Sequence, residues 1–134
     1  FMCGCGNYGC WSALCSGKGM KNLAKKLMRK NITPENIFRI AEKGNKNAQR
    51  LIDIVRDYNA QGIGIMLNAL QVEEIVVMGS LGLRQFDKII PNQDELKRYA
   101  VKPLHKRGFS FVVCDVCPKG LISQTAIPRA AAGF

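Results

Sequence analysis

The strongest periodic pattern in the chain runs from Asn45 to about Leu70. Apolar side chains recur there at intervals of three and four, which predicts one long helix with a single apolar stripe. Gly62 and Gly64 fall inside this segment. Glycine weakens a helix, but on the stripe it would also let a sheet pack closely against the helix. The predicted stripe consists of Ala48, Leu51, Ile52, Val55, Tyr58, Gly62, Ile63, Met66, Ala69 and Leu70.

The sequence after this helix predicts two strands with a further helix between them. Ile75–Met78 is an unbroken apolar run that ends at Gly79-Ser80-Leu81-Gly82. Continuous apolarity is typical of a parallel strand that is buried on both faces. Asn92 to about Leu104 predicts another helix, and Phe109–Val116 predicts a second buried strand. The order helix, strand, helix, strand indicates an α/β fold.

Two shorter helices are predicted before the long one. Leu23 and Leu27 recur at helical spacing among lysines, which indicates a short amphipathic helix. Thr33 and Pro34 begin the second helix, because threonine suits the N-cap and proline suits the first helical position. This second helix is predicted to stop at Gly44.

The charge of the chain permits polyanionic partners without identifying one. Lys and Arg number 20 against 10 Asp and Glu, a net charge of +10, and half of the basic residues lie between Lys18 and Arg50. Phe38 is the only aromatic residue among them, so a solvated basic face is favoured over a nucleic-acid patch. No membrane partner is expected, because the longest uncharged stretches, Phe1–Gly17 and Asn59–Val72, are too polar or too short to span a bilayer.

The length and the first residue bear on organisation and location. A chain of 134 residues that is 47% apolar fits one globular domain. The chain begins with Phe1 instead of an initiator methionine, and it shows no charged segment followed by an apolar segment as in a signal peptide. We therefore expect a piece of a longer protein that works in the cytoplasm.

Three cysteines are packed into the segment Cys3-Gly4-Cys5-Gly6-Asn7-Tyr8-Gly9-Cys10. Thiolates are the ligands of structural zinc, and glycines permit the backbone turns that so tight a loop requires. The pattern predicts a metal site, with a set of partly buried free thiols as the alternative. Cys15, a residue upstream of the chain and His105 are the candidates for a fourth ligand.

Two further features favour structural roles. Cys114 and Cys117 have the spacing of a redox dithiol, but they end a predicted strand instead of opening a helix, so two core or edge thiols are favoured. His105 is the only histidine and lies two residues after Pro103, which favours a surface position over a ligand or a base.

The cysteine segment and its continuation carry a family resemblance. Cys-Gly-Cys-Gly-x-x-Gly-Cys followed by Trp-x-Ala-x-x-Ser-Gly, here Cys3–Gly17, resembles the zinc motif of ROK-family proteins. That family comprises sugar kinases such as glucokinase, together with related transcriptional repressors. The Thr-Pro-Glu-x-Ile-Phe helix start, the long helix and the Glu-x-Ile-Val-Val-Met-Gly strand follow in the same order, and the similarity extends to about Val113.

The resemblance implies a fold and an activity. The fold is α/β: half of an actin-like (ribonuclease H-like) ATPase fold, in which long helices pack on a mostly parallel sheet beside an N-terminal zinc loop. ATP would lie between two lobes and pass a phosphate to a sugar hydroxyl. The implied segments of this C-terminal lobe are a zinc-binding loop at 1–17, a helical segment at 18–72 and a nucleotide-side α/β segment at 73–134.

The resemblance also assigns roles to individual residues. Cys3, Cys5 and Cys10 match the three zinc cysteines, and the fourth ligand in the family is an upstream histidine outside this chain. Ser12 stands where the family has a sugar-binding glutamate. The pair Gly79-Ser80 stands where a Gly-Gly pair passes close to the nucleotide in the family, with Gly79 matching the pattern.

These residues lead to two expectations for function. The first is the C-terminal fragment of a sugar kinase whose full-length parent uses ATP and Mg to phosphorylate a hexose such as glucose, and which forms a dimer. The second is a non-catalytic relative, such as a repressor or a sugar-sensing, zinc-binding interaction module. The family's phosphate loop, its Asn-Asp pair and its Glu-x-Gly-His motif are absent from these 134 residues, so we expect the isolated chain to be inactive.

Overall fold

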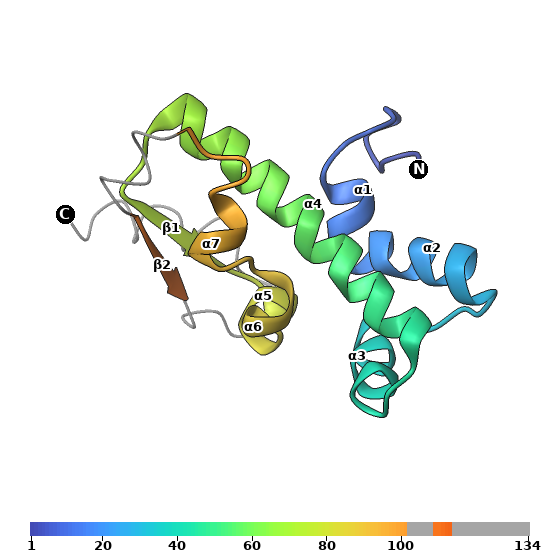
Figure 1. The fold of residues 1–134 in the computed structure, drawn as a ribbon. Helices are drawn as coiled ribbons and strands as arrows, with labels where there is room; N and C mark the ends of the chain where they lie inside the picture. The colour runs from blue at the N-terminus through green and yellow to red at the C-terminus, as the bar shows by residue number, and fades with distance from the viewer. Residues whose placement is uncertain (102–108, 114–134) are drawn as a thin grey trace.

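One long helix runs through the computed structural model, which describes residues 1–101 and 109–113 (Figure 1). This helix, α4, spans Lys46–Leu70 and confirms the predicted long helix. The side chain of Asn45 caps its start by accepting a hydrogen bond from the backbone N–H of Ala48 at 3.0 Å. Its end is capped by Gln71, which adopts a left-handed conformation with φ of 51°. The helix continues unbroken through Gly62.

The buried face of α4 differs from the predicted stripe. Tyr58 and Met66, both assigned to that stripe, are 41% and 36% exposed. The polar side chain of Asn59 takes a buried place on this face instead, because tertiary hydrogen bonds satisfy its amide. The buried residues of the helix are Ala48, Leu51, Val55, Asn59, Ala60, Ile63, Gly64 and Leu67.

Three helices pack on the N-terminal half of α4 (Figure 1). They are α1 (Ser12–Cys15), α2 (Gly17–Met28) and α3 (Pro34–Glu42). The two predicted short helices, α2 and α3, are confirmed, and Thr33 caps α3 by accepting from the N–H of Asn36. Their apolar faces form one core with α4, and its buried residues are Met20, Leu23, Ala24, Ile37, Phe38, Ala41, Ala48, Leu51, Val55 and Ile89.

The other half of α4 lies against a small α/β unit. Strands β1 (Glu74–Val77) and β2 (Ser110–Val113) pair in parallel with Glu74 opposite Ser110, which confirms an α/β fold with a parallel pair. Ile63 and Leu67 of α4 form a second core with Leu96, Ile75 and Phe111. Three short helices complete this half: α5 (Ser80–Arg84), α6 (Phe86–Ile89) and α7 (Gln93–Leu96).

Three predictions for this half are wrong. Neither strand is buried on both faces, because the residues of β1 alternate between exposed and half-buried and three of the four residues of β2 are exposed. The helix predicted from Asn92 also ends early, at Leu96. Asn68 of α4 holds the chain beyond this end, since its side chain donates to the carbonyl of Tyr99 and accepts from the N–H of Val101, both at 2.8 Å. These bonds hold the chain in an irregular path after α7.

Some predictions concern residues outside the described ranges. These are the last part of the helix predicted to Leu104, the end of the strand predicted to Val116, His105 and the pair Cys114 and Cys117. Among the helices of residues 1–101, none has the combination of length and apolar character that a membrane crossing requires.

Candidate functional site

The cysteine loop, residues 3–10, is a tight turn held by its own backbone. The N–H of Cys3 donates to the carbonyl of Asn7 at 2.8 Å, and the N–H of Gly6 donates back to the carbonyl of Cys3 at 3.1 Å. Gly6 and Gly9 have φ values of +89° and +78°, a region that glycine enters without a steric penalty. The glycines predicted to permit the turn therefore occupy the conformations that bring the three cysteines together.

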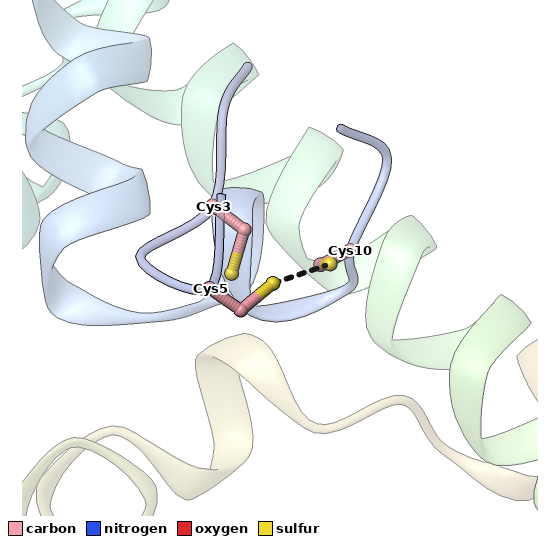
Figure 2. A group of neighbouring side chains, drawn as sticks. All are labelled: Cys3, Cys5 and Cys10. Carbon is pink, nitrogen blue, oxygen red and sulfur yellow. Dashed lines mark hydrogen bonds between the residues drawn. The ribbon is translucent and has the colours of Figure 1, made fainter. Parts of the chain in front are cut away.

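The three thiols converge as the spacing predicts. Figure 2 shows the side chains of Cys3, Cys5 and Cys10 gathered in the loop, and their sulfur atoms all lie within 4.8 Å of one another. The Sγ atoms of Cys5 and Cys10 are 3.6 Å apart. A tetrahedral zinc ion with Zn–S bonds of about 2.3 Å separates its sulfur ligands by about 3.8 Å. The donor set and its spacing therefore fit zinc.

Hydrogen bonds divide the thiols by acidity. The hydroxyl of Ser12 lies 3.3 Å from Sγ of Cys3, and this contact, supported by Cys5, lowers the pKa of Cys3 to about 6. Hydrogen bonds with Cys5 and Cys3 raise the pKa of Cys10 to about 11. The Cys3 thiol is therefore the more acidic of the two. A bound cation would favour deprotonation of Cys10.

Cys15 lies away from this cluster. Its Sγ donates to the backbone carbonyl of Val55 on α4 at 3.6 Å, and burial raises the pKa of its thiol to about 11. The structure thus gives Cys15 a packing role between α1 and α4. Its candidacy as the fourth ligand is wrong for this arrangement, and the remote candidate, His105, lies outside the described residues.

Trp11 anchors the loop to α4, a contact that sequence reasoning missed. The indole Nε1–H donates to Oδ1 of Asn59 at 2.8 Å, and Nδ2 of Asn59 donates to the carbonyl of Ile89 at 2.8 Å. Asn59 is 6% exposed, and this chain of bonds connects the cysteine loop, α4 and α6. In the sequence, Asn59 could be recognised only as a polar residue next to the predicted apolar stripe. Its position does not indicate which residues it bonds to.

Ser12 begins α1 and borders an open depression. This depression, called the Trp11 depression below, has a volume of about 500 Å³. It is lined by Trp11, Ser12, Cys15, Ser16 and Asn59.

Gly79 and Ser80 join β1 to α5. Gly79 has φ of +89° and ψ of 154°, which favours glycine strongly, and a Cβ at this position would meet no atom within 4 Å. Ser80 is exposed and borders a second hollow, the Ser80 cavity, of about 170 Å³. The cavity is lined by Gly17, Pro34, Glu35, Phe38, Ser80, Leu81, Arg84 and Gln85.

The start of α2 connects the two hollows. Ser16, the N-cap of α2, lines the Trp11 depression, and Gly17, its first residue, lines the Ser80 cavity. Ser12 and Ser80 are far apart in the sequence. They nevertheless border neighbouring hollows, which meet at the start of α2. Sequence reasoning named both serines but could not place them relative to α2.

Comparison with known sequences gives consistent results. The model of the ROK family matches residues 1–124. A glucokinase of Pyrobaculum calidifontis is 32% identical over 107 residues, covering 79% of this chain and 35% of that protein. An N-acetyl-D-glucosamine kinase of Histophilus somni is 30% identical over 115 residues, covering 81% of this chain and 36% of that protein. The chain thus spans about a third of the length of these relatives.

Two solved structures share the fold. A ROK hexokinase from Thermus thermophilus aligns with a TM-score of 0.65 and 23% identity, over 74% of this chain and 34% of that chain. A ROK family transcriptional regulator, described as a homologue of the E. coli MLC protein, aligns with a TM-score of 0.63 and 20% identity, over 84% of this chain and 31% of that chain.

Proposed function

Because the chain belongs to the ROK family, we propose that it is the C-terminal part of a sugar kinase whose complete protein uses ATP to phosphorylate a hexose such as glucose. The observation that carries this proposal is the 32% identity with a glucokinase over 107 residues. In this proposal the chain is one lobe of an actin-like fold, and residues 1–17, 18–72 and 73–134 are its loop, helical and nucleotide-side segments.

The first part of the proposal is a structural zinc ion held by Cys3, Cys5 and Cys10. The support is the convergence of three sulfur atoms within 4.8 Å on a loop whose backbone is already closed. When bound, the ion would lock this loop by cross-linking its two ends. A fourth ligand from the complete protein would close the site.

The second part concerns the substrates. Ser12 would face the sugar, and its hydroxyl can donate one hydrogen bond and accept others, but it lacks the negative charge that strengthens the bonds accepted by a carboxylate. Gly79 and Ser80 would lie at the nucleotide, with support from the open space beside Gly79 and the cavity at Ser80. Mg would accompany ATP in the complete protein and neutralise charge on its phosphates.

The complete protein would work in the cytoplasm, where ATP is available, and as a dimer. Apolar side chains that remain exposed on the described residues support association. They include Ile65 at 68% and Leu70 at 65% exposure.

A second candidate function has specific support. The structural likeness to a ROK transcriptional regulator extends over 84% of this chain, and Ser12 replaces the carboxylate expected of a sugar kinase. On this alternative the complete protein senses a sugar or acts as a zinc-binding interaction module, and it transfers no phosphate.

A coupled kinase assay separates the candidates. It compares the 134-residue chain, the chain continued upstream along its own gene to the length of the matched kinases, and that longer protein carrying Ser12→Glu. The kinase proposal expects turnover of glucose by the longer protein, which Ser12→Glu increases, and none by the short chain. Absence of turnover by both longer proteins, with retained sugar binding, would establish the regulator.

A further inference from the structure

Trp11 lies between a proposed metal ligand, Cys10, and the proposed sugar-facing residue, Ser12. Its indole is fixed in one orientation from two sides. The indole N–H is bonded to Asn59 at 2.8 Å, and a Cβ at Gly62 would come within 2.5 Å of the ring. The ring therefore packs directly on the backbone of α4, where only glycine leaves space for it.

Trp11 as a residue nevertheless remains 38% exposed. Its indole N–H is already bonded to Asn59, and the residue lines the Trp11 depression. A large aromatic side chain held rigidly with ring surface open to solvent loses hydrophobic stabilisation unless a ligand or partner covers it.

The rim of the depression supplies hydroxyl groups. Ser12 contributes one hydroxyl, and Ser16 contributes another. The oxygen of Ser16 accepts from the N–H of Gly19 at 3.1 Å, so its own O–H can still donate to a ligand. The lining residues, Trp11, Ser12, Cys15, Ser16 and Asn59, include no Lys, Arg, Asp or Glu.

This combination matches an uncharged pyranose ring. The C–H groups of a pyranose face are weakly positive and pack against the negative face of an aromatic ring, while its hydroxyls bond to polar groups at the edge. A phosphate or a nucleotide tail would find no cation among the lining residues. The depression is open to solvent, so a ligand would lie against the ring with its other face exposed.

We propose that Trp11 is the stacking platform of a carbohydrate subsite, with Ser12 and Ser16 at its rim and with Asn59 and Gly62 as the positioning residues that hold the platform. The proposal rests on the proposed sugar-kinase function and identifies a residue that would determine which sugars that site accepts. A platform of this kind discriminates ring-shaped sugars from open-chain polyols.

Tryptophan fluorescence and saturation-transfer NMR, both on the 134-residue chain, test the proposal. Trp11 is the only tryptophan, so its emission reports on this site alone. Glucose and N-acetylglucosamine are expected to change the emission saturably, and glycerol, a polyol without a ring, is not. Saturation transfer is expected to be strongest at the C–H protons of the sugar ring. Transfer that is absent, or that is equal for glycerol and glucose, would overturn the proposal.

Variants at three positions sharpen the test. Trp11→Leu is expected to weaken sugar affinity at least about 10-fold, and Trp11→Phe is expected to restore part of it. Asn59→Ala keeps the indole but removes the hydrogen bond that orients it, so it is expected to weaken affinity. Tyr58→Leu is the matched control, because this aromatic residue of α4 is 41% exposed and does not line the depression. Equal affinity in Trp11→Leu, Trp11→Phe and wild type would contradict the platform.

The kinase assay keeps this inference separate from the proposed function. Glucose turnover by the longer protein with an unchanged KM in Trp11→Leu would overturn the platform alone. Trp11-dependent sugar binding without any turnover would overturn the kinase function alone. A tryptophan emission that responds to protein concentration and not to sugar would show that a second copy covers the ring, and would also overturn the platform.

Discussion

At the scale of single residues, Ser12 belongs to two environments. Its hydroxyl contacts the thiol of Cys3 at 3.3 Å, and its side chain also borders the Trp11 depression. One short side chain therefore contacts both the cysteine loop and the proposed sugar side. The two cysteines nearest to it in the sequence, Cys10 and Cys15, diverge: one joins the loop and the other packs on α4.

Metal binding is the first prediction at this scale. Cys5→Ser removes one of three convergent sulfur ligands, so zinc affinity is expected to fall by at least about 100-fold. The charge-transfer absorption of bound cobalt(II), followed by displacement with zinc, measures this change. Cys15→Ser is the matched control and is expected to leave metal affinity unchanged, since its thiol faces Val55. Equal losses in both variants would contradict the assignment of ligands.

The contact between Gly62 and Trp11 leads to a second prediction. In Gly62→Ala the new Cβ would lie 2.5 Å from the indole, so the ring must move. The clash is expected to cost about 1–3 kcal/mol in the free energy of unfolding, offset by up to about 1 kcal/mol of gained helix propensity. Urea unfolding measures the net loss, and tryptophan emission is expected to shift to longer wavelength. Ile65→Ala, at a position 68% exposed on the same helix, should change stability much less.

At the scale of elements, polar side chains attach α7 and the segment after it to α4. Nε of Arg56 donates to both carboxylate oxygens of Glu95, at 2.8 and 2.9 Å. Glu95 also accepts from the N–H of Asn92 at 2.7 Å, which completes the capping box of α7. A helix as short as α7 has little stability of its own, so these bonds and the burial of Leu96 hold it in place.

The Arg56–Glu95 contact predicts a dependence of stability on pH. The hydrogen bond from Arg56 lowers the pKa of Glu95 below its usual value of 4.5. A carboxyl whose pKa is lower in the folded state stabilises the fold above its unfolded pKa and loses that contribution as pH falls through the folded pKa. Glu95→Gln is therefore expected to lower stability at pH 7 by up to about 1 kcal/mol and to lose less stability than wild type on acidification below about pH 4.5.

Urea unfolding at pH 7, 4.5 and 3 measures this difference. Asp94→Asn is the control variant, because the partner of Asp94 is the exposed Lys97 and the aspartate side chain is 84% exposed. Its effect at pH 7 is expected to be smaller than that of Glu95→Gln. Identical pH profiles for wild type and Glu95→Gln would show that the contact with Arg56 contributes nothing.

At the scale of the whole molecule, α4 is the common support of two cores. Its first half carries α1, α2 and α3, and its second half packs near α7 and the parallel strands (Figure 1). Several apolar side chains lie outside both cores. Those more than half exposed include Met2, Tyr8, Ile65 and Leu70.

Exposed apolar residues on α4 predict self-association. Burial of Ile65 and Leu70, which are 68% and 65% exposed, would remove apolar surface from water. Light scattering is expected to detect dimers or larger species at high protein concentration, and Ile65→Lys combined with Leu70→Lys is expected to shift the protein toward the monomer. A monomeric wild-type protein at high concentration would refute this prediction.

Local signals allowed much of this protein to be predicted from the sequence. Thr33 caps α3 as expected, because a cap requires only neighbouring residues. The cysteine loop also forms within a few residues, so glycine positions and thiol spacing sufficed to predict the convergence of Cys3, Cys5 and Cys10.

Contacts distant in the sequence decided the rest. Asn59 is buried in place of Tyr58 because Trp11 and Ile89 supply its hydrogen bonds, and α7 ends at Leu96 where Asn68 holds the following chain. The hollows at Ser12 and Ser80 are neighbours because consecutive residues at the start of α2 line one hollow each. This placement also depends on contacts between distant parts of the sequence. Which face of a helix is buried depends on the partners that the fold supplies, and periodicity alone does not name those partners.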